Sequence, residues 1–141
     1  MRLLRPALAL LLILPLAGCP QPSANTPPQA IAPGYISPAD QQMAEILSGS
    51  RTFYNTVQCE TRGLNWSQPT AQCMIDPSIT KPLLLTATEK AAFNDFGTTL
   101  NIAETAHLAY HYGMGTLATA QSAVTATQQK QTSLPPLAVT K

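Results

Sequence analysis

Apolar residues recur at helical spacing in three separate segments of the chain. In the first segment, six residues are separated by steps of three, four or seven positions, which places them on one side of a helix: Met43, Ile46, Leu47, Phe53, Tyr54 and Val57. Ser37 suits the N-cap, Pro38 suits the first helical position, and Asp40 can meet the free amides and the helix dipole. The pattern predicts a helix from Ser37 to about Gln58.

The second segment begins with Thr86 and Glu89 at the spacing of a capping box. Its apolar and aromatic positions then alternate by three and four residues, which favours packing against a partner helix: Phe93, Phe96, Leu100, Ala103, His107 and Tyr110. Gly113 and Gly115 supply a helix stop and a turn. We therefore expect the second helix to end close to Tyr112.

The third segment runs from about Leu117 to Thr132 and is rich in Ala, Thr and Gln. Its inner face is thin, with Leu117, Ala120, Val124 and either Thr127 or Gln128. Because threonine and serine weaken helix propensity, packing on the second helix must supply most of the stability. The prolines that follow Leu134 end this helix.

Residues 1–18 have the layout of an export signal, with Arg2 and Arg5 ahead of an apolar run that is too short to span a bilayer. The stretch Leu16-Ala17-Gly18-Cys19 resembles the lipobox of bacterial lipoproteins. That resemblance implies cleavage before Cys19, lipid attachment to Cys19 and anchoring on a membrane. The alternative is an ordinary secretory signal or an uncleaved anchor in which Cys19 has no special role.

If Cys19 carries lipid, Cys59 and Cys73 remain as an even pair. An exported protein meets an oxidising compartment, so we expect a disulfide between them. It would close a loop of about 15 residues and contribute about 3 kcal/mol. A zinc site is the alternative, but four ligands are usual for zinc and the sequence has no second cysteine pair.

Residues 60–85 have no apolar periodicity and contain Gly63, Pro69, Pro77 and Pro82, which predicts a long irregular connection that could also hold two short strands. Trp66, Met74, Ile75 and the run Leu83 to Leu85 could dock it onto the helices. The predicted fold is all-α: a small antiparallel three-helix bundle with a disulfide-tied irregular insertion between helices one and two. The predicted organisation is a signal peptide (1–18), a Pro-rich tether (19–36), a helical domain (37–134) and a flexible tail (135–141).

Charge excludes some classes of partner. Removal of the signal would leave six Lys and Arg against seven Asp and Glu, without a basic stripe, so we expect no nucleic-acid partner. Neither Ser48-Gly49-Ser50 nor Gly97-Thr98-Thr99 has the context of a nucleophile, and Gly113-Met114-Gly115 is no phosphate loop. We therefore predict no catalytic residue and no cofactor.

Two groups of residues could bind something. Glu104, His107 and His111 can share one helical face and are weak candidates for metal ligands. A di-iron site would need a second Glu-x-x-His pair, and we favour a structural role for these residues. Arg62 and Trp66 lie inside the predicted disulfide loop, and both residue types dominate interface hot spots. Trp66 could instead cover the open end of the bundle.

The sequence thus predicts a non-enzymatic envelope accessory or adaptor protein, anchored through Cys19 and associated with another envelope protein. The alternative is a metal-binding lipoprotein that uses Glu104, His107 and His111. Pro20 follows the lipobox cysteine where aspartate would signal inner-membrane retention in many diderm bacteria. This favours an outer-membrane location facing the periplasm.

Overall fold

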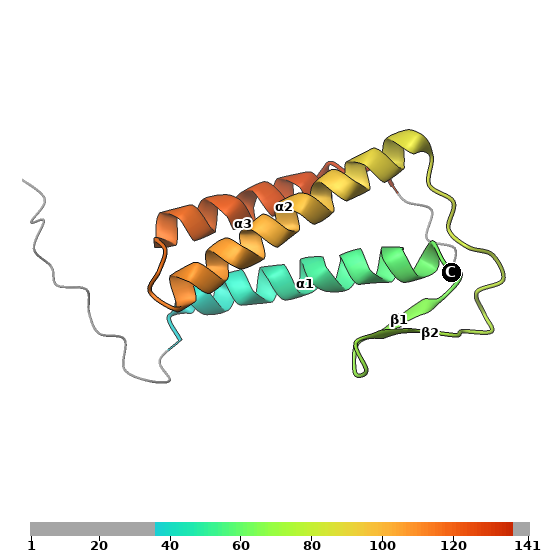
Figure 1. Cartoon of the computed structure of the whole chain (residues 1–141), viewed down its shortest axis with the longest axis horizontal. Helices are drawn as coiled ribbons and strands as arrows, with labels where there is room; N and C mark the ends of the chain where they lie inside the picture. The colour runs from blue at the N-terminus through green and yellow to red at the C-terminus, as the bar shows by residue number, and fades with distance from the viewer. Residues whose placement is uncertain (1–35, 137–141) are drawn as a thin grey trace, which may run out of the picture. The chain divides into compact units, whose positions relative to one another are not determined.

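The computed structural model describes residues 36–136, and the predictions for the signal, the lipid-bearing Cys19, the tether and residues 137–141 lie outside them. The described chain contains α1 (Pro38–Glu60), β1 (Asn65–Ser67), β2 (Gln72–Met74), α2 (Ala87–His111) and α3 (Leu117–Thr132). The three helices lie side by side, and the two strands lie beyond the end of α1 (Figure 1). The expected three helices are confirmed.

Each helix begins at the residue that its capping chemistry predicts. The Ser37 hydroxyl accepts the amide of Asp40 at 3.1 Å, and Pro38 opens α1. Thr86 and Glu89 form the complete capping box of α2, and Thr116 caps α3. After α2, Gly113 adopts a φ of +71°, the left-handed region that ends helices most readily at glycine.

All three helices bury side chains in one core. Phe96 and Leu100 of α2 have no exposed surface, and they are joined there by Val57 of α1 and Val124 of α3. Aromatic rings complete the contact between α1 and α2: Tyr54 stacks on Phe93 with ring centroids 4.8 Å apart. On α3, Thr127 and not Gln128 is the buried residue of the inner face. Its hydroxyl donates to the carbonyl of Ala123 at 3.0 Å.

The all-α prediction is wrong, because part of the insertion forms an antiparallel two-stranded sheet. β1 and β2 pair with Trp66 opposite Cys73, and Ala71 in the turn between them has a φ of +52°. Three-residue strands are too short for the alternation of apolar and polar residues that identifies a strand in a sequence. The predicted disulfide is confirmed: Cys59 at the end of α1 is bonded to Cys73 of β2.

The rest of the insertion returns along the end of α1. The amide of Leu83 donates to the carbonyl of Glu60 at 2.8 Å, and the Leu83 side chain is buried in the core. Met74, Ile75 and Leu84, which the sequence suggested would dock on the helices, are instead exposed. The body therefore has two distinct ends. We call residues 36–40 and 107–116 the turn end, and residues 59–85 the hairpin end (Figure 1).

Two glycine substitutions test the packing of Tyr54 on α2. A Cβ atom at Gly97 would lie 2.5 Å from Cε2 of Tyr54, whose ring is held by Phe93, so Gly97→Ala should lower the free energy of unfolding by about 1 to 3 kcal/mol. Gly49→Ala in α1 meets no atom within 4 Å and should raise it by about 0.5 to 1 kcal/mol. Urea denaturation measures both. Stabilisation by Gly97→Ala would contradict the described contact.

Candidate functional site

Asp40, His107 and His111 form a hydrogen-bonded cluster at the turn end, which we call the Asp40 cluster. The first turn of α1 carries Asp40, while the histidines lie one turn apart on the last part of α2. Oδ1 of Asp40 lies 2.5 Å from Nε2 of His107, and Oδ2 lies 2.7 Å from Nδ1 of His111. One carboxylate thus joins the start of α1 to the end of α2.

Asp40 as a residue is only 6% exposed, so the charge of its carboxylate needs partners. Burial raises the pKa of Asp40, but hydrogen bonds and charge attraction from His111 and His107 outweigh that effect and hold the pKa below its ordinary value. An ionised Asp40 only accepts hydrogen bonds. His107 must therefore carry a proton on Nε2 and His111 one on Nδ1.

The contacts of the Asp40 cluster are those of a structural connection. Within residues 36–136 neither histidine hydrogen-bonds to a serine, threonine or cysteine side chain, so no activated nucleophile stands beside them. The Ser37 hydroxyl instead caps α1 and lies 3.4 Å from the Tyr110 hydroxyl. Asp40, which was predicted from the sequence to interact with the free amides of α1, instead directs its side chain to α2.

The three residues considered as metal ligands are not brought together. Both histidines contact Asp40, whereas Glu104 is bound by Arg51 of α1 through Nε at 2.8 Å and through Nη2. Arg51 also donates to Asn101 at 2.7 Å. In the part of the chain that the structure describes, no group of three or more His, Cys, Asp or Glu side chains is arranged to hold a metal ion. A Glu104 site would require this ion pair to open.

A groove of about 660 Å³ runs between α1 and α2. Its lining mixes the apolar side chains of Leu47 and Leu108 with the Arg51–Glu104 pair and His107. Since each of these polar groups already has a partner in the other helix, the groove has no free charge directed at a ligand. Its polar residues are explained by the attachment of α1 to α2.

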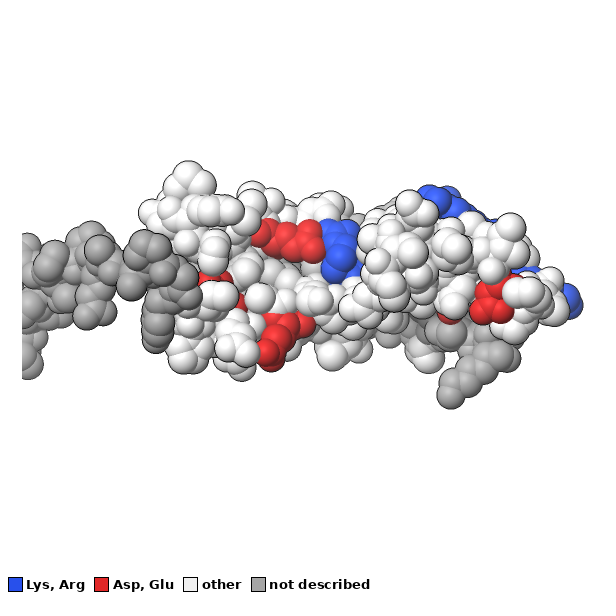
Figure 2. Space-filling view, turned by 90° about the horizontal axis from the view of Figure 1, so that it is seen from below, with Lys and Arg blue, Asp and Glu red and all other residues white. Residues whose placement is uncertain are grey.

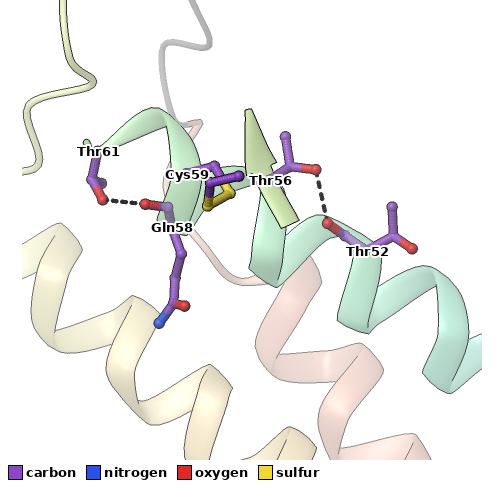
Figure 3. The surroundings of a disulfide bond; sticks show 6 residues. Thr52, Thr56, Gln58, Cys59 and Thr61 are labelled. Atoms are coloured by element: carbon purple, nitrogen blue, oxygen red, sulfur yellow. Dashed lines mark hydrogen bonds between the residues drawn. A yellow bond between two sulfur atoms is a disulfide. The ribbon is translucent and has the colours of Figure 1, made fainter. Parts of the chain in front are cut away.

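The hairpin end is fixed to α1 by the disulfide (Figure 3). Beside it, the Thr61 hydroxyl donates to the carbonyl of Gln58 at 2.8 Å and so satisfies one of the last carbonyls of the helix. Arg62 is exposed, whereas Trp66 is half-buried. Among described residues, Nε1 of Trp66 and Oε2 of Glu60 are buried without a hydrogen-bond partner, and burial raises the pKa of Glu60.

The most exposed apolar side chains of the hairpin end were not singled out as binding residues by the sequence. Ile75 is 86% exposed and Leu84 is 87% exposed, and Met74 lies next to Ile75. No pattern in residues 60–85 separates exposed from buried apolar positions, since the buried Leu83 is adjacent to the exposed Leu84. Adjacent exposed apolar residues, such as Met74 and Ile75, are typical of surfaces that bind another protein.

The described surface carries little concentrated charge. Figure 2 shows one face of the body, on which a few small acidic and basic groups, two of them of opposite sign and in contact, lie among uncharged residues. None of the described helices has both the length and the hydropathy needed to cross a bilayer. Comparison with protein-family models, with curated proteins and with solved structures finds no match to the chain.

The contribution of Asp40 to stability should depend on pH in a defined direction. Because its folded pKa is lowered, the stabilisation is present in full above the unfolded pKa of 3.8 and is lost as the pH falls through the folded value. At neutral pH, Asp40→Asn should lower the free energy of unfolding by about 1 to 3 kcal/mol. The difference from wild type should shrink below about pH 4, as measured by urea unfolding across the pH range.

Asp95→Asn is the matched control, because Asp95 is half-exposed and its Lys130 partner is exposed too. An exposed pair of this kind contributes about 1 kcal/mol or less. If Asp40→Asn were no more destabilising than Asp95→Asn, or if its effect grew in acid, the Asp40 cluster would not hold α1 as described.

Proposed function

We propose that this chain is a membrane-anchored bacterial lipoprotein whose non-enzymatic body is an adaptor for another envelope protein. The observation that carries the proposal is the position of the disulfide-tied hairpin. The hairpin end, which carries this hairpin, exposes Ile75 and Leu84 and lies at the opposite end of α1 from Ile36, the first described residue after the proposed lipid site. Figure 1 shows the two strands beyond the end of α1. A protein held at one end and apolar at the other is suited to join a membrane to a partner.

The disulfide supports export. Stable disulfides form in the periplasm and outside the cell, and they are rare in the reducing cytosol. Cys59 and Cys73 are joined in a closed hairpin with Cα atoms 5.4 Å apart. An oxidising compartment is where the proposed signal at residues 1–18 and the lipobox at Leu16–Cys19 would send the chain. We place the protein at the outer membrane, facing the periplasm, because Pro20 follows Cys19.

A binding role fits the hairpin end better than a catalytic one. Ile75 and Leu84 would lose their exposed apolar surface against a partner, and this loss is the main source of binding free energy. Trp66 is half-buried and packs from inside the disulfide loop, so we assign it the role of supporting the hairpin. Arg62 is exposed beside it and can supply a polar contact at the rim.

The first prediction concerns the anchor. In a diderm host, the wild-type chain should be recovered with Cys19 as its acylated N-terminus and should sediment with outer membranes. Cys19→Ser should abolish both acylation and cleavage, because the lipoprotein peptidase requires the cysteine. Mass spectrometry of the N-terminal peptide and density fractionation of membranes measure the two effects. Cleavage of wild type at another bond, or an N-terminus without acyl chains, would contradict the proposed anchor.

The second prediction concerns the partner. A photo-crosslinking amino acid placed at Ile75 or Leu84 in intact cells should give one discrete adduct, whereas the same probe at Ile102 should give none. Ile102 is a matched control because it is an exposed apolar residue on α2, away from the hairpin. The adduct should disappear in the Cys59→Ser, Cys73→Ser double variant, in which the hairpin is released from α1. Equal labelling from all three positions would argue against a specific surface.

A further inference from the structure

We infer that the turn end is a second interaction surface and that its partner is the lipid bilayer itself. This inference rests on the proposed lipid anchor at Cys19. Four large apolar or aromatic side chains are exposed at this end: Ile36 at 55%, Leu108 at 54%, Tyr112 at 66% and Met114 at 77%. Ile36 precedes the N-cap of α1, Leu108 lies in the last turn of α2, and Tyr112 and Met114 belong to the turn that joins α2 to α3.

The backbone of the turn fixes these side chains outward. The amides of Met114 and Gly115 both donate to the carbonyl of Ala109, at 2.8 and 3.0 Å. Gly113 supplies the left-handed conformation between Tyr112 and Met114. Because the turn is held by its own hydrogen bonds, contact through Tyr112 and Met114 requires little further ordering of the backbone, which favours binding.

The turn end also has no exposed Asp, Glu, Lys or Arg side chain, and its partly exposed His111 is bonded to Asp40. Within residues 36–44 and 105–120 the only Asp, Glu, Lys or Arg is Asp40, and its carboxylate is buried against His107 and His111. Charged side chains are costly to bring to the acyl boundary, whereas tyrosine is favoured at the level of the headgroups. A surface of Ile, Met and Tyr without Lys or Arg fits a lipid interface and would bind it without electrostatic attraction.

The position of the anchor selects lipid as the occupant. Sixteen residues lie between Cys19 and Ile36, so a Pro-rich tether with a rise of about 3.1 Å per residue keeps the turn end within about 50 Å of Cys19. A tether of this length gives an effective concentration of roughly millimolar. Contacts too weak to bind a membrane from solution would therefore suffice, and the proposed adaptor surface at the hairpin end would point away from the bilayer.

The methionines of the chain provide an internal test. The lipidated protein is reconstituted in vesicles of phosphatidylcholine alone and treated with a membrane-impermeant oxidant at pH 8, and sulfoxide formation is followed by mass spectrometry. In an undocked body Met114, at 77% exposed, should react faster than Met74, at 46%, and buried Met43 should react slowest. Docking of the turn end on the bilayer should reverse the order of these two residues, so that Met114 is oxidised roughly threefold or more slowly than Met74. Added salt should not change this.

A double variant, Ile36→Ser with Tyr112→Ser, should return Met114 to faster oxidation than Met74. Continued protection of Met43 in that variant shows that the body is still folded. The Ile102→Ser variant is the matched control, since it removes an exposed apolar side chain outside the turn end and should leave Met114 protected.

The remaining outcomes separate this inference from the proposed function. If the N-terminal peptide is acylated at Cys19 but Met114 reacts faster than Met74, the lipid contact is refuted while the lipoprotein assignment stands. Protection of Met114 that grows with the number of protein molecules per vesicle would mean that a second copy covers the turn end, and this too overturns the inference. A chain that carries no acyl group removes the basis of both proposals.

Discussion

Burial of Phe96 and Leu100 joins all three helices, since both side chains of α2 lie wholly inside the core that α1 and α3 complete. α3 brings little apolar surface of its own to this core, mainly Ala120 and Val124. Its helix propensity is modest, so α3 depends on contact with α2 for its stability. The arrangement of the whole body follows from which residues of α2 face inward, and the caps at Thr86 and Thr116 fix where the helices that share this core begin.

The contact of α1 with α2 needs more than the core. At the turn end this contact is held by the Asp40 cluster, and farther along the helices by the Arg51–Glu104 pair. Nearer to the hairpin end it is held by aromatic stacking of Tyr54 on Phe93. Apolar packing tolerates sliding of one helix against another, whereas a buried carboxylate that must meet two particular nitrogens does not. We regard the Asp40 cluster as a device that fixes the register of the two helices, a role best established for buried polar groups.

The sequence was sufficient for the helices because their signals are local. The N-cap at Ser37, the capping box at Thr86 and the spacing of apolar residues each involve neighbours within a few positions, and the observed bounds of α3 agree with those predicted. The Cys59–Cys73 disulfide could be predicted because two cysteines remain once Cys19 is assigned to lipid, and because an exported chain meets an oxidising compartment. The strands were only a possibility from the sequence, because three residues carry no periodicity and the pairing of Trp66 with Cys73 depends on the turn and the disulfide.

The partners of the candidate site residues could not be predicted for a different reason. Glu104, His107 and His111 can share a helical face, but the register of α1 decides which groups meet them, and no single-helix pattern contains that information. Arg51 takes Glu104, and Asp40 takes both histidines. The same register removes the only carboxylate of the turn end from solvent and leaves Tyr112 and Met114 uncovered. The pairing of polar groups between the helices thus determines which groups remain on the surface. The two ends of the body differ because the turn end is held by the paired carboxylate of Asp40, whereas the hairpin end is held by the Cys59–Cys73 disulfide.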